Sequence, residues 1–543
     1  MPDAQLSARA LETLLGEWRG AGAHYQALAD RIRLLVLDGR IPIDTRLPAE
    51  RDLAARLGLS RTTVTATYRA LREAGFVASL RGSGTLTRLP GPVLVPAPAQ
   101  ADGLLDFSKA ALPAATTLAA AARAAAEELP HFLADSGYDP VGLPHLRETI
   151  AERYRSRGLP TEPGQILVTV GAQQAIALIA RTFVSRGDRA LIEMPTYPHA
   201  YEALRSAGAR LVPVTVVPVD GAARAVRSAD AGARRAGAAG DRASGSARSA
   251  DANSAAGATV DRASGSALSV AGASRGDAHA SGDDGWDSDA IEQAIARANP
   301  TLAYVIPDFH NPTGASMSVT TRRRLLAAAA GHGMIVVADE TTADLDIDRA
   351  ETFGPLGTYG QGRAGDAPVI HIGSASKSLW GGLRIGWIRA ERPIIRRLIA
   401  AKPANDLGTP IIEQLVVARM LPDMASIVEE RRVQLRAGRE QVRMLVAERF
   451  TEWTMPALDG GLAAWVGIGA PISSQLALGA RNNGLSITAG PRFGLDGAFE
   501  RFLRIPITYS SAETTRAFDA LAAAWSTVLR HPVPDTGYLA DVV

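Results

Sequence analysis

The sequence contains no cysteine and no apolar run long enough to cross a membrane. Without cysteine there is no disulfide framework, no thiolate metal site and no cysteine nucleophile. The first residues lack the basic-then-apolar order of a signal peptide, and the alanine-rich stretch 118–126 is interrupted by Arg123. These absences favour a cytoplasmic protein with no membrane partner.

Lysine is also scarce, because only Lys109, Lys377 and Lys402 stand among the 58 basic residues. A chain that meets its charge needs with arginine retains a lysine mainly where arginine cannot serve. Lys377 closes the motif Gly-Ser-Ala-Ser-Lys after the apolar run 369–372. Its amine can lose a proton near neutral pH and form a Schiff base with an aldehyde, whereas arginine stays protonated. Alone, Lys377 would be a solvated residue at a helix start; its neighbours favour a reactive amine.

At 543 residues with 46% apolar content, the chain is long enough for at least two domains with their own cores. The net charge of +2 indicates no class of partner by itself. Its distribution is more informative, since residues 46–88 hold eight arginines and three acidic residues.

The N-terminal part alternates apolar helical patterns with turn residues and ends in two short apolar runs around Arg81-Gly82-Ser83-Gly84. The expected segments are three helices and a hairpin: residues 24–39, Pro48 to Gly58, 61–74, 76–80 and 85–89. This order predicts a winged helix-turn-helix domain within residues 1–88.

Residues 89–104 contain four prolines and are expected to form a semi-rigid linker. Beyond them, over 105–543, apolar runs alternate with helical segments, which is typical of an α/β domain with a mostly parallel sheet. The expected strands are residues 166–170, 190–194, 302–307, 334–338 and 369–372.

Residues 221–285 interrupt this alternation with alanine, glycine, serine, arginine and aspartate and almost no large apolar residues. The segment also repeats itself, since Asp-Arg-Ala-Ser-Gly-Ser-Ala occurs at 241–247 and 261–267. So little apolar surface does not offset the entropy lost on ordering, and we expect a disordered insertion that is dispensable for folding.

Polar groups follow the ends of the predicted strands, where an open parallel sheet places its ligand. They are Ala172 and Gln173, Tyr197, Asn311, Asp339, Ser374, Lys377 and Arg384. Together they offer a lysine imine, a carboxylate for a pyridinium, a stacking ring and a phosphate cup, which are the parts that pyridoxal 5′-phosphate requires. Each motif alone is weak, because Asn-Pro-Thr-Gly is often a plain turn and a strand-end aspartate is often a helix cap.

With these motifs in this order, residues 105–530 resemble a fold-type I aminotransferase domain, and residues 24–88 resemble a GntR-type winged helix. Their fusion resembles the MocR subfamily of bacterial regulators. The resemblance implies an N-terminal winged helix-turn-helix joined to an α/β aminotransferase domain with a large, mostly parallel part and a small C-terminal α/β part.

The resemblance also implies roles for the site residues. Lys377 would carry the cofactor as a Schiff base, Asp339 would pair with its pyridine nitrogen, Asn311 would bond its 3′-oxygen, and Tyr197 would stack on its ring. Ala172, Gln173, Ser374 and Arg384 would surround its phosphate, and Tyr138 would reach the phosphate of a neighbouring subunit. Arg504 would grip an amino acid carboxylate; alternatively, it is a surface strand residue.

For the DNA-binding half, the resemblance places the start of the third helix in the major groove. Arg61 suits a bidentate contact with guanine. The other residues expected to contact DNA are Arg51, Ser60, Thr62, Thr63, Tyr68, Arg81, Gly82 and Ser83. The alternative for this half is a basic protein-interaction module.

One departure from the family is that Thr341 and Thr342 stand where a tyrosine usually bonds the 3′-oxygen, which puts efficient transamination in doubt. The leading hypothesis is therefore a homodimeric transcriptional regulator that binds two DNA half-sites and senses an amino acid, an amine or a B6 vitamer. The alternatives are a working aminotransferase with a secondary DNA-binding domain, and a DNA-binding scaffold with an empty cofactor fold. The third is disfavoured because Lys377, Asp339 and Asn311 are all present.

Overall fold

The structure of the chain is a computed structural model. It describes residues 5–16, 18, 24–37, 40–42, 45–73, 75–80, 84–88, 104–218, 284–360, 366–495 and 497–530.

In its described residues, the N-terminal domain has four helices and a two-stranded antiparallel hairpin. Its elements are α1 (Ala8–Leu15), α2 (His24–Leu37), α3 (Glu50–Leu57), α4 (Arg61–Glu73), β1 (Val77–Leu80) and β2 (Gly84–Thr87). Gly58 ends α3 in the left-handed conformation at φ 62°, and the Ser60 hydroxyl accepts a hydrogen bond from the Thr63 amide at the start of α4. Helix α1, which begins after the N-cap Ser7 and buries Leu11 and Leu15, was not predicted. The other elements match the expected segments within a few residues.

The large domain is organised around a seven-stranded sheet with the order β4-β10-β9-β8-β7-β5-β6. Its strands are β4 (Ile166–Thr169), β5 (Arg189–Met194), β6 (Arg210–Thr215), β7 (Leu302–Val305), β8 (Ile335–Asp339), β9 (Val369–Ser374) and β10 (Gly386–Arg389). Only β10 runs against its neighbours β4 and β9. The five expected strands are all present, and β6 and β10 complete the sheet.

Helices cover both faces of this sheet, which explains why its strands are apolar on both sides. One face packs on α7 (Gly171–Phe183), α8 (Pro198–Ser206) and α12 (Arg392–Ala401), and the other on α10 (Ser288–Ala298) and α11 (Val319–Gly331). A further cluster joins α5 (Leu118–Glu128), α6 (Pro144–Ser156) and α13 (Ile411–Met420) to the β4 side.

The small domain has a three-stranded antiparallel sheet with the order β11-β14-β13 and a parallel pair of β12 with β3. These strands are β3 (Leu105–Asp106), β11 (Ala463–Gly467), β12 (Leu485–Ser486), β13 (Thr488–Ala489) and β14 (Phe502–Pro506). Helices α14 (Met424–Arg449), α15 (Ser473–Asn482) and α16 (Ser511–Arg530) pack on them around a core that includes Leu503 and Phe518. Leu105 and Asp106, the first residues after the expected linker, therefore belong to the small domain.

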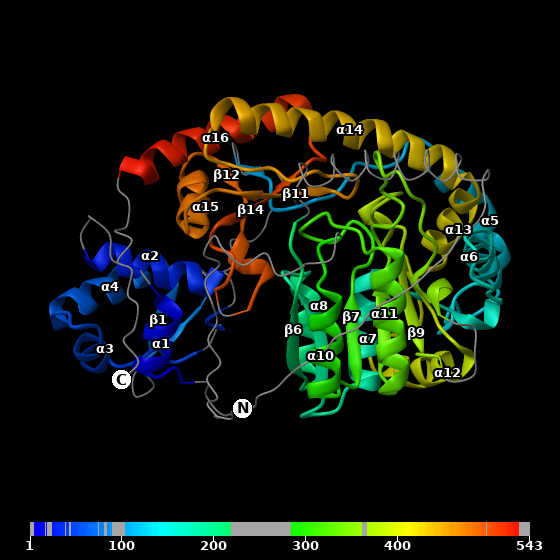
Figure 1. The fold of residues 1–543 in the computed structure, drawn as a ribbon, viewed down its shortest axis with the longest axis horizontal. Helices are drawn as coiled ribbons and strands as arrows, with labels where there is room; N and C mark the ends of the chain where they lie inside the picture. The colour runs from blue at the N-terminus through cyan, green and yellow to red at the C-terminus, as the bar shows by residue number, and fades with distance from the viewer. Residues whose placement is uncertain are drawn as a thin grey trace, which may run out of the picture.

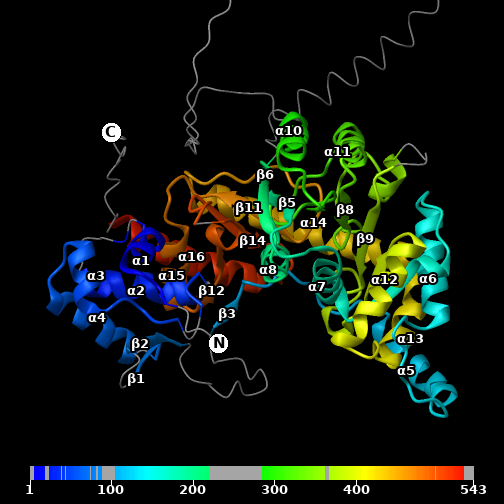
Figure 2. The ribbon, with the colours of Figure 1, turned by 90° about the horizontal axis from the view of Figure 1, so that it is seen from below.

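Seven short 3₁₀ helices connect these elements within the described residues: Leu129–Phe132, Pro163–Gln165, Leu356–Tyr359, Gly381–Leu383, Lys402–Ala404, Leu421–Asp423 and Gly490–Phe493. In Figure 1 the long helix α14 runs along the top of the large and the small domain. The winged domain lies beside the small domain and away from the large sheet (Figures 1 and 2). An ion pair between Arg31 and Glu500, at 3.5 Å, joins them.

The expected insertion 221–285 lies outside the described residues except for its last two positions, and the expected linker lies outside them except for Leu104. The C-terminal boundary of the insertion was wrong. Asp284 is 7% exposed and accepts hydrogen bonds from Ser318 and Thr321, and the carbonyl of Gly285 accepts one from the Val217 amide. Asp284 accepts these hydrogen bonds at the start of α11 and therefore belongs to the folded domain, although the residues before it have the composition of the insertion.

No helix among the described residues combines the length and the apolar character needed to cross a bilayer.

The two flanks of the insertion lie side by side, because Val216 and Trp286 form an antiparallel bridge. We expect that replacing residues 219–283 by a four-residue glycine–serine loop will not lower the free energy of unfolding and will raise it by at most about 2.4 kcal/mol, because this shortening is about four halvings of the loop. Each halving of a flexible loop removes only about 0.6 kcal/mol of closure entropy. Urea denaturation of both chains measures this.

Trp286→Ala is the control for that experiment, because its side chain is fully buried and donates to Glu193 at 2.8 Å. This substitution should lower the free energy of unfolding by about 3–5 kcal/mol. A shortened chain as unstable as the Trp286 variant would contradict the expectation.

Candidate functional site

A cleft of about 910 Å³, counted out to its mouth, lies at the carboxyl ends of the parallel strands. Nine expected site residues line it: Ala172, Gln173, Tyr197, Asn311, Asp339, Ser374, Lys377, Arg384 and Arg504. They come from positions as far apart as 172 and 504 in the chain, so the fold brings them together.

Asp339, the last residue of β8, is 4% exposed. The hydroxyl of Tyr304, on β7, donates to its Oδ2 at 2.5 Å, and the Thr341 amide donates to its Oδ1 at 3.0 Å. Burial raises the pKa of Asp339, although these hydrogen bonds and the charge of Lys377 act in the opposite direction. The carboxyl group is therefore held rigidly at the floor of the cleft, where a protonated ring nitrogen would be its ion-pair partner.

Lys377 follows β9 and lines the same cleft. Burial lowers the pKa of its amine, the nearby positive charge of Arg504 lowers it further, and Asp339 raises it. A lowered pKa increases the share of the neutral amine, which is the nucleophilic form that attacks an aldehyde.

A second cationic region is formed where α7 begins. A Cβ placed on Gly171 would lie 2.8 Å from Nη2 of Arg384, so the guanidinium stands directly at the helix N-terminus. A Cβ on Gly386 would lie 2.5 Å from the carbonyl carbon of Gly171, so only glycine permits this close approach of β10 and α7. The first amides of a helix together with a guanidinium form an anion site suited to a phosphate.

Ser374, Gln173 and Tyr197 surround the space between these two regions. Ser374 is 7% exposed and accepts a hydrogen bond from the Ser376 amide at 3.1 Å. The Tyr197 hydroxyl donates to Oε1 of Gln173 at 3.2 Å, and burial raises the pKa of Tyr197 to about 12. The tyrosine is therefore neutral at physiological pH, with its ring along the cleft.

Asn311 lies in the loop after β7. The side chain of the neighbouring His310 fixes the buried side of this loop. Nδ1 of His310 lies 2.9 Å from the hydroxyl of Thr313, and its Nε2 lies 3.3 Å from the fully buried Glu193. The amide of Asn311 thus lines the cleft on a loop whose buried side is held by polar contacts.

Arg504, on β14, reaches the cleft from the small domain. Its guanidinium lies 5.0 Å above the ring of Phe493 and donates to the carbonyl of Ser108. Burial lowers the pKa of Arg504 to about 10, so the group remains charged at neutral pH. Arg504 is not a surface strand residue, because its head group lies inside the cleft.

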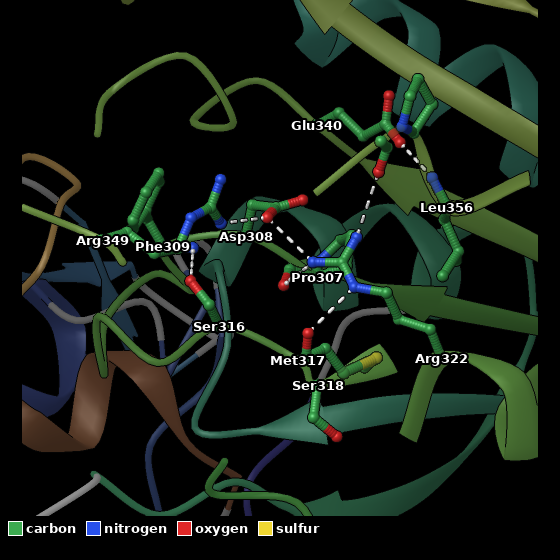
Figure 3. Close-up of polar contacts among 12 residues, drawn as sticks. Pro307, Asp308, Phe309, Ser316, Met317, Ser318, Arg322, Glu340, Arg349 and Leu356 are labelled. Carbon is green, nitrogen blue, oxygen red and sulfur yellow. Dashed lines mark hydrogen bonds and ion pairs between the residues drawn. The ribbon is translucent and has the colours of Figure 1, made fainter. Parts of the chain in front are cut away.

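Thr341 and Thr342 line the cleft beside Asp339. The Thr342 hydroxyl donates to the carbonyl of Asp308 at 2.8 Å, so its proton is used within the protein. Asp308 itself lies between the guanidinium groups of Arg322, at 2.8 Å, and Arg349, at 2.5 Å (Figure 3). These three buried charged side chains fix the backbone at Asp308, whose carbonyl accepts the hydrogen bond from Thr342.

Tyr138 does not line the cleft within this chain, and its side chain is 71% exposed. It lies between the 3₁₀ helix Leu129–Phe132 and α6 on the surface of the large domain. Its contact with a neighbouring subunit therefore stays a prediction.

At the N-terminal domain, Arg51, Ser60, Arg61 and Thr62 are exposed and Thr63 is half-buried. The expectation for Tyr68 was wrong. Its side chain is 1% exposed, and its hydroxyl donates to the Pro48 carbonyl at 2.8 Å, so it joins α4 to the start of α3 in the core. Arg81, Gly82 and Ser83, at the tip of the hairpin, lie outside the described residues.

Comparison with known families identifies both halves of the chain. Residues 24–86 match the model of bacterial regulatory proteins of the gntR family, and residues 104–236 and 269–521 match aminotransferase class I and II. The second match spans more than half of the chain, so the chain belongs to the class I and II aminotransferases, with a gntR-family DNA-binding domain at its N-terminus. Pyridoxal 5′-phosphate is the cofactor that this family implies.

Among similar proteins, an uncharacterized HTH-type transcriptional regulator, YdfD of Bacillus subtilis, is 23% identical over 90% of this chain and 93% of its own. The probable rhizopine catabolism regulatory protein MocR of Rhizobium meliloti is 26% identical over 67% of this chain and 64% of its own. The two-domain arrangement is the one predicted from the sequence.

Among solved structures, LysN, the α-aminoadipate aminotransferase of Thermus thermophilus, superposes with a TM-score of 0.61 at 24% identity. The alignment covers 79% of this chain and 93% of LysN. The expected α/β fold of the aminotransferase domain is thereby confirmed.

The residues present fit the implied cofactor. A buried carboxylate, a lysine with a lowered pKa and a helix start with an adjacent guanidinium face one cleft, and these are the groups that a pyridine nitrogen, an aldehyde and a phosphate require.

Sequence reasoning missed Tyr304, which donates to Asp339, and Ser108, which contacts Arg504. Tyr304 had one available indication: a tyrosine inside a buried apolar strand needs a partner for its hydroxyl. Ser108 had none, because its contact uses the backbone carbonyl.

Glu340, next to Asp339, is a buried carboxylate whose contribution to the free energy of unfolding can be measured. Burial alone would raise the pKa of Glu340. The charge of His371, the 3.0 Å contact between His371 and Glu340, and the charge of Arg157 outweigh burial and lower this pKa from 4.5 to about 2. Because the folded pKa is depressed, the stabilisation is complete above pH 4.5 and disappears as the pH falls towards 2.

Glu340→Gln should therefore lower the free energy of unfolding at pH 7, by an amount on the order of 3 kcal/mol. The difference from the wild type should shrink between pH 4.5 and pH 2. Urea denaturation at pH 7, 5 and 3 checks this, and a difference that is the same at all three values would show that the carboxylate is not stabilised by charge.

Proposed function

We propose that this chain is a DNA-binding transcriptional regulator whose aminotransferase-like domain holds pyridoxal 5′-phosphate through Lys377 and senses an amino acid, an amine or a B6 vitamer. The observation that carries this proposal is the presence of two built sites in one chain. One is the exposed start of α4 with Arg61, and the other is the cleft with Lys377, Asp339 and Arg504.

In the cleft, Lys377 and Asp339 would hold the aldehyde and ring-nitrogen ends of the cofactor. Asn311 would bond the 3′-oxygen and Tyr197 would cover the ring. Ala172, Gln173, Ser374 and Arg384 would hold the phosphate. When bound, the cofactor supplies an aldehyde that condenses with primary amines and a ring that withdraws electrons.

At the DNA, Arg61 would read a base edge in the major groove, while Arg51, Ser60, Thr62 and Thr63 would contact the backbone or neighbouring bases. We propose a homodimer, with Tyr138 reaching across the interface and two winged domains binding two half-sites. A ligand changes DNA binding only through different affinities for the two states of the dimer.

The second candidate function is a working aminotransferase with a secondary DNA-binding domain. Its support is the complete cofactor cleft. The geometry of Thr342 favours sensing instead, because its hydroxyl donates to the Asp308 carbonyl and would not donate to the 3′-oxygen of a bound cofactor.

The visible absorption of the purified chain, titrated with amino acids and amines, tests the proposal. We expect a band from the covalently held cofactor that shifts with a subset of ligands without conversion of the cofactor to its amine form. Conversion to that form would favour the aminotransferase. In Lys377→Ala, borohydride reduction should leave no cofactor attached to the chain; an adduct that persists would show that another amine holds it.

Arg61→Ala should reduce the preference for the target sequence over random DNA, because a bidentate contact with guanine is worth about 1–3 kcal/mol. Arg72→Ala is the matched control, since Arg72 is an exposed arginine in the last turn of the same helix. Titration of labelled DNA with the full-length chain measures both. Equal effects of the two substitutions would mean that the start of α4 does not read bases.

A further inference from the structure

Residues Leu105–Ala110, here called the strap, run from the small domain to the mouth of the cleft. The carbonyl of Ser108 accepts a hydrogen bond from Nη2 of Arg504. Nζ of Lys377 lies 3.5 Å from the carbonyl of Ala110. Two side chains that the proposed function assigns to a ligand and its cofactor are therefore contacted by the backbone of the chain itself.

The small domain holds the strap in this position. Its first two residues form β3, which pairs with β12, and Phe107 is fully buried against Tyr509, with 4.3 Å between the rings. The Tyr509 hydroxyl donates to the carbonyl of Asp106 and lies 3.1 Å from that of Lys109. These contacts leave the carbonyl of Ser108 directed at Arg504, and the hydroxyl of Thr488 lies 3.5 Å from the same oxygen.

The contact with Ser108 satisfies Arg504 only in part. Nε of Arg504 is buried and has no hydrogen-bond partner among the described residues. A carbonyl is neutral, whereas a carboxylate carries a full charge and can accept two parallel N–H bonds from a guanidinium. A ligand carboxylate is therefore a stronger partner for Arg504 than the carbonyl that it would displace.

We propose that the strap is an internal competitor that selects ligands bearing a carboxylate: such a ligand takes Arg504 from Ser108 and releases the strap, whereas an amine without a carboxylate leaves it in place. This inference rests on the proposed function, because it names the ligand class and the regulation of the same site. The strap also directly follows the residues that connect the two domains, so its release loosens the point at which that connection is anchored.

The scarcity of lysine provides a direct measurement. Lys109, inside the strap, has a side chain that is 75% exposed, whereas that of Lys402 is 1% exposed and Lys377 lies in the cleft. A lysine-specific endoprotease acting briefly on the folded full-length chain therefore cuts after Lys109, at a rate that reports how often the strap opens.

Sodium propionate, which is a carboxylate without an amine, is the probe. We expect it to raise the rate of cleavage after Lys109 at least about ten-fold in a saturable manner, compared with sodium chloride at the same ionic strength. This is the effect of losing one hydrogen bond to a charged group. A rate that propionate leaves unchanged or lowers would overturn the proposal.

Two variants test the contacts separately. Arg504→Gln should show fast cleavage without propionate and no further response to it. Tyr509→Phe, which keeps the ring and removes the hydroxyl, should raise the basal rate about three- to ten-fold while the chain still responds to propionate. Tyr359→Phe is the matched control, because its hydroxyl accepts from the Gly354 amide far from the strap, and it should cleave like the wild type.

Wild-type rates in the Tyr509 variant would overturn the proposal even if the Arg504 variant fails to fold. Because none of these measurements requires the cofactor, a chain without a visible cofactor band would refute the proposed function and leave the cleavage result intact. A cofactor band together with propionate-independent cleavage would refute the strap alone.

Discussion

The parallel direction of the central strands is the constraint on which the site depends. Strands β5, β7, β8 and β9 run the same way, so their carboxyl ends meet at one edge, and the loops that leave them carry Tyr197, Asn311, Asp339 and Lys377 to a common cleft. The antiparallel strand β10 lies between β4 and β9. It brings Gly386 against the start of α7 and so fixes Arg384 at the N-terminus of that helix.

Buried charge keeps this edge rigid. Asp308 accepts from both Arg322 and Arg349, and two phenylalanine rings cover Arg349, with Phe309 at 4.5 Å and Phe353 at 4.8 Å. Removing one member of such a group leaves the others uncompensated, which is strongly destabilising, so the arrangement specifies one geometry more than it adds stability. Phe309 lines the cleft, and this geometry therefore extends to the wall of the cleft.

The sequence was sufficient to predict the helix-turn-helix, five strands of the large sheet and the residues that follow them, because each has a local pattern of apolar spacing and turn residues. It was not sufficient for contacts that depend on packing. Tyr68 reads as a polar residue on a basic helix, yet the orientation of α4 turns it into the core. The contact between Ser108 and Arg504 joins segments separated by almost the whole C-terminal domain and uses a backbone atom, which no residue type reveals.

The pairing of Val217 with Gly285 has a consequence for engineering. Because the chain leaves and re-enters the fold through adjacent, antiparallel backbone segments, any sequence placed between them is a side branch that does not alter the register of β6 or the start of α10. A fluorescent protein, whose own termini lie close together, fits such a junction. Because Trp286, directly after the junction, packs against His310 in the wall of the cleft, the inserted domain would report on changes in that wall.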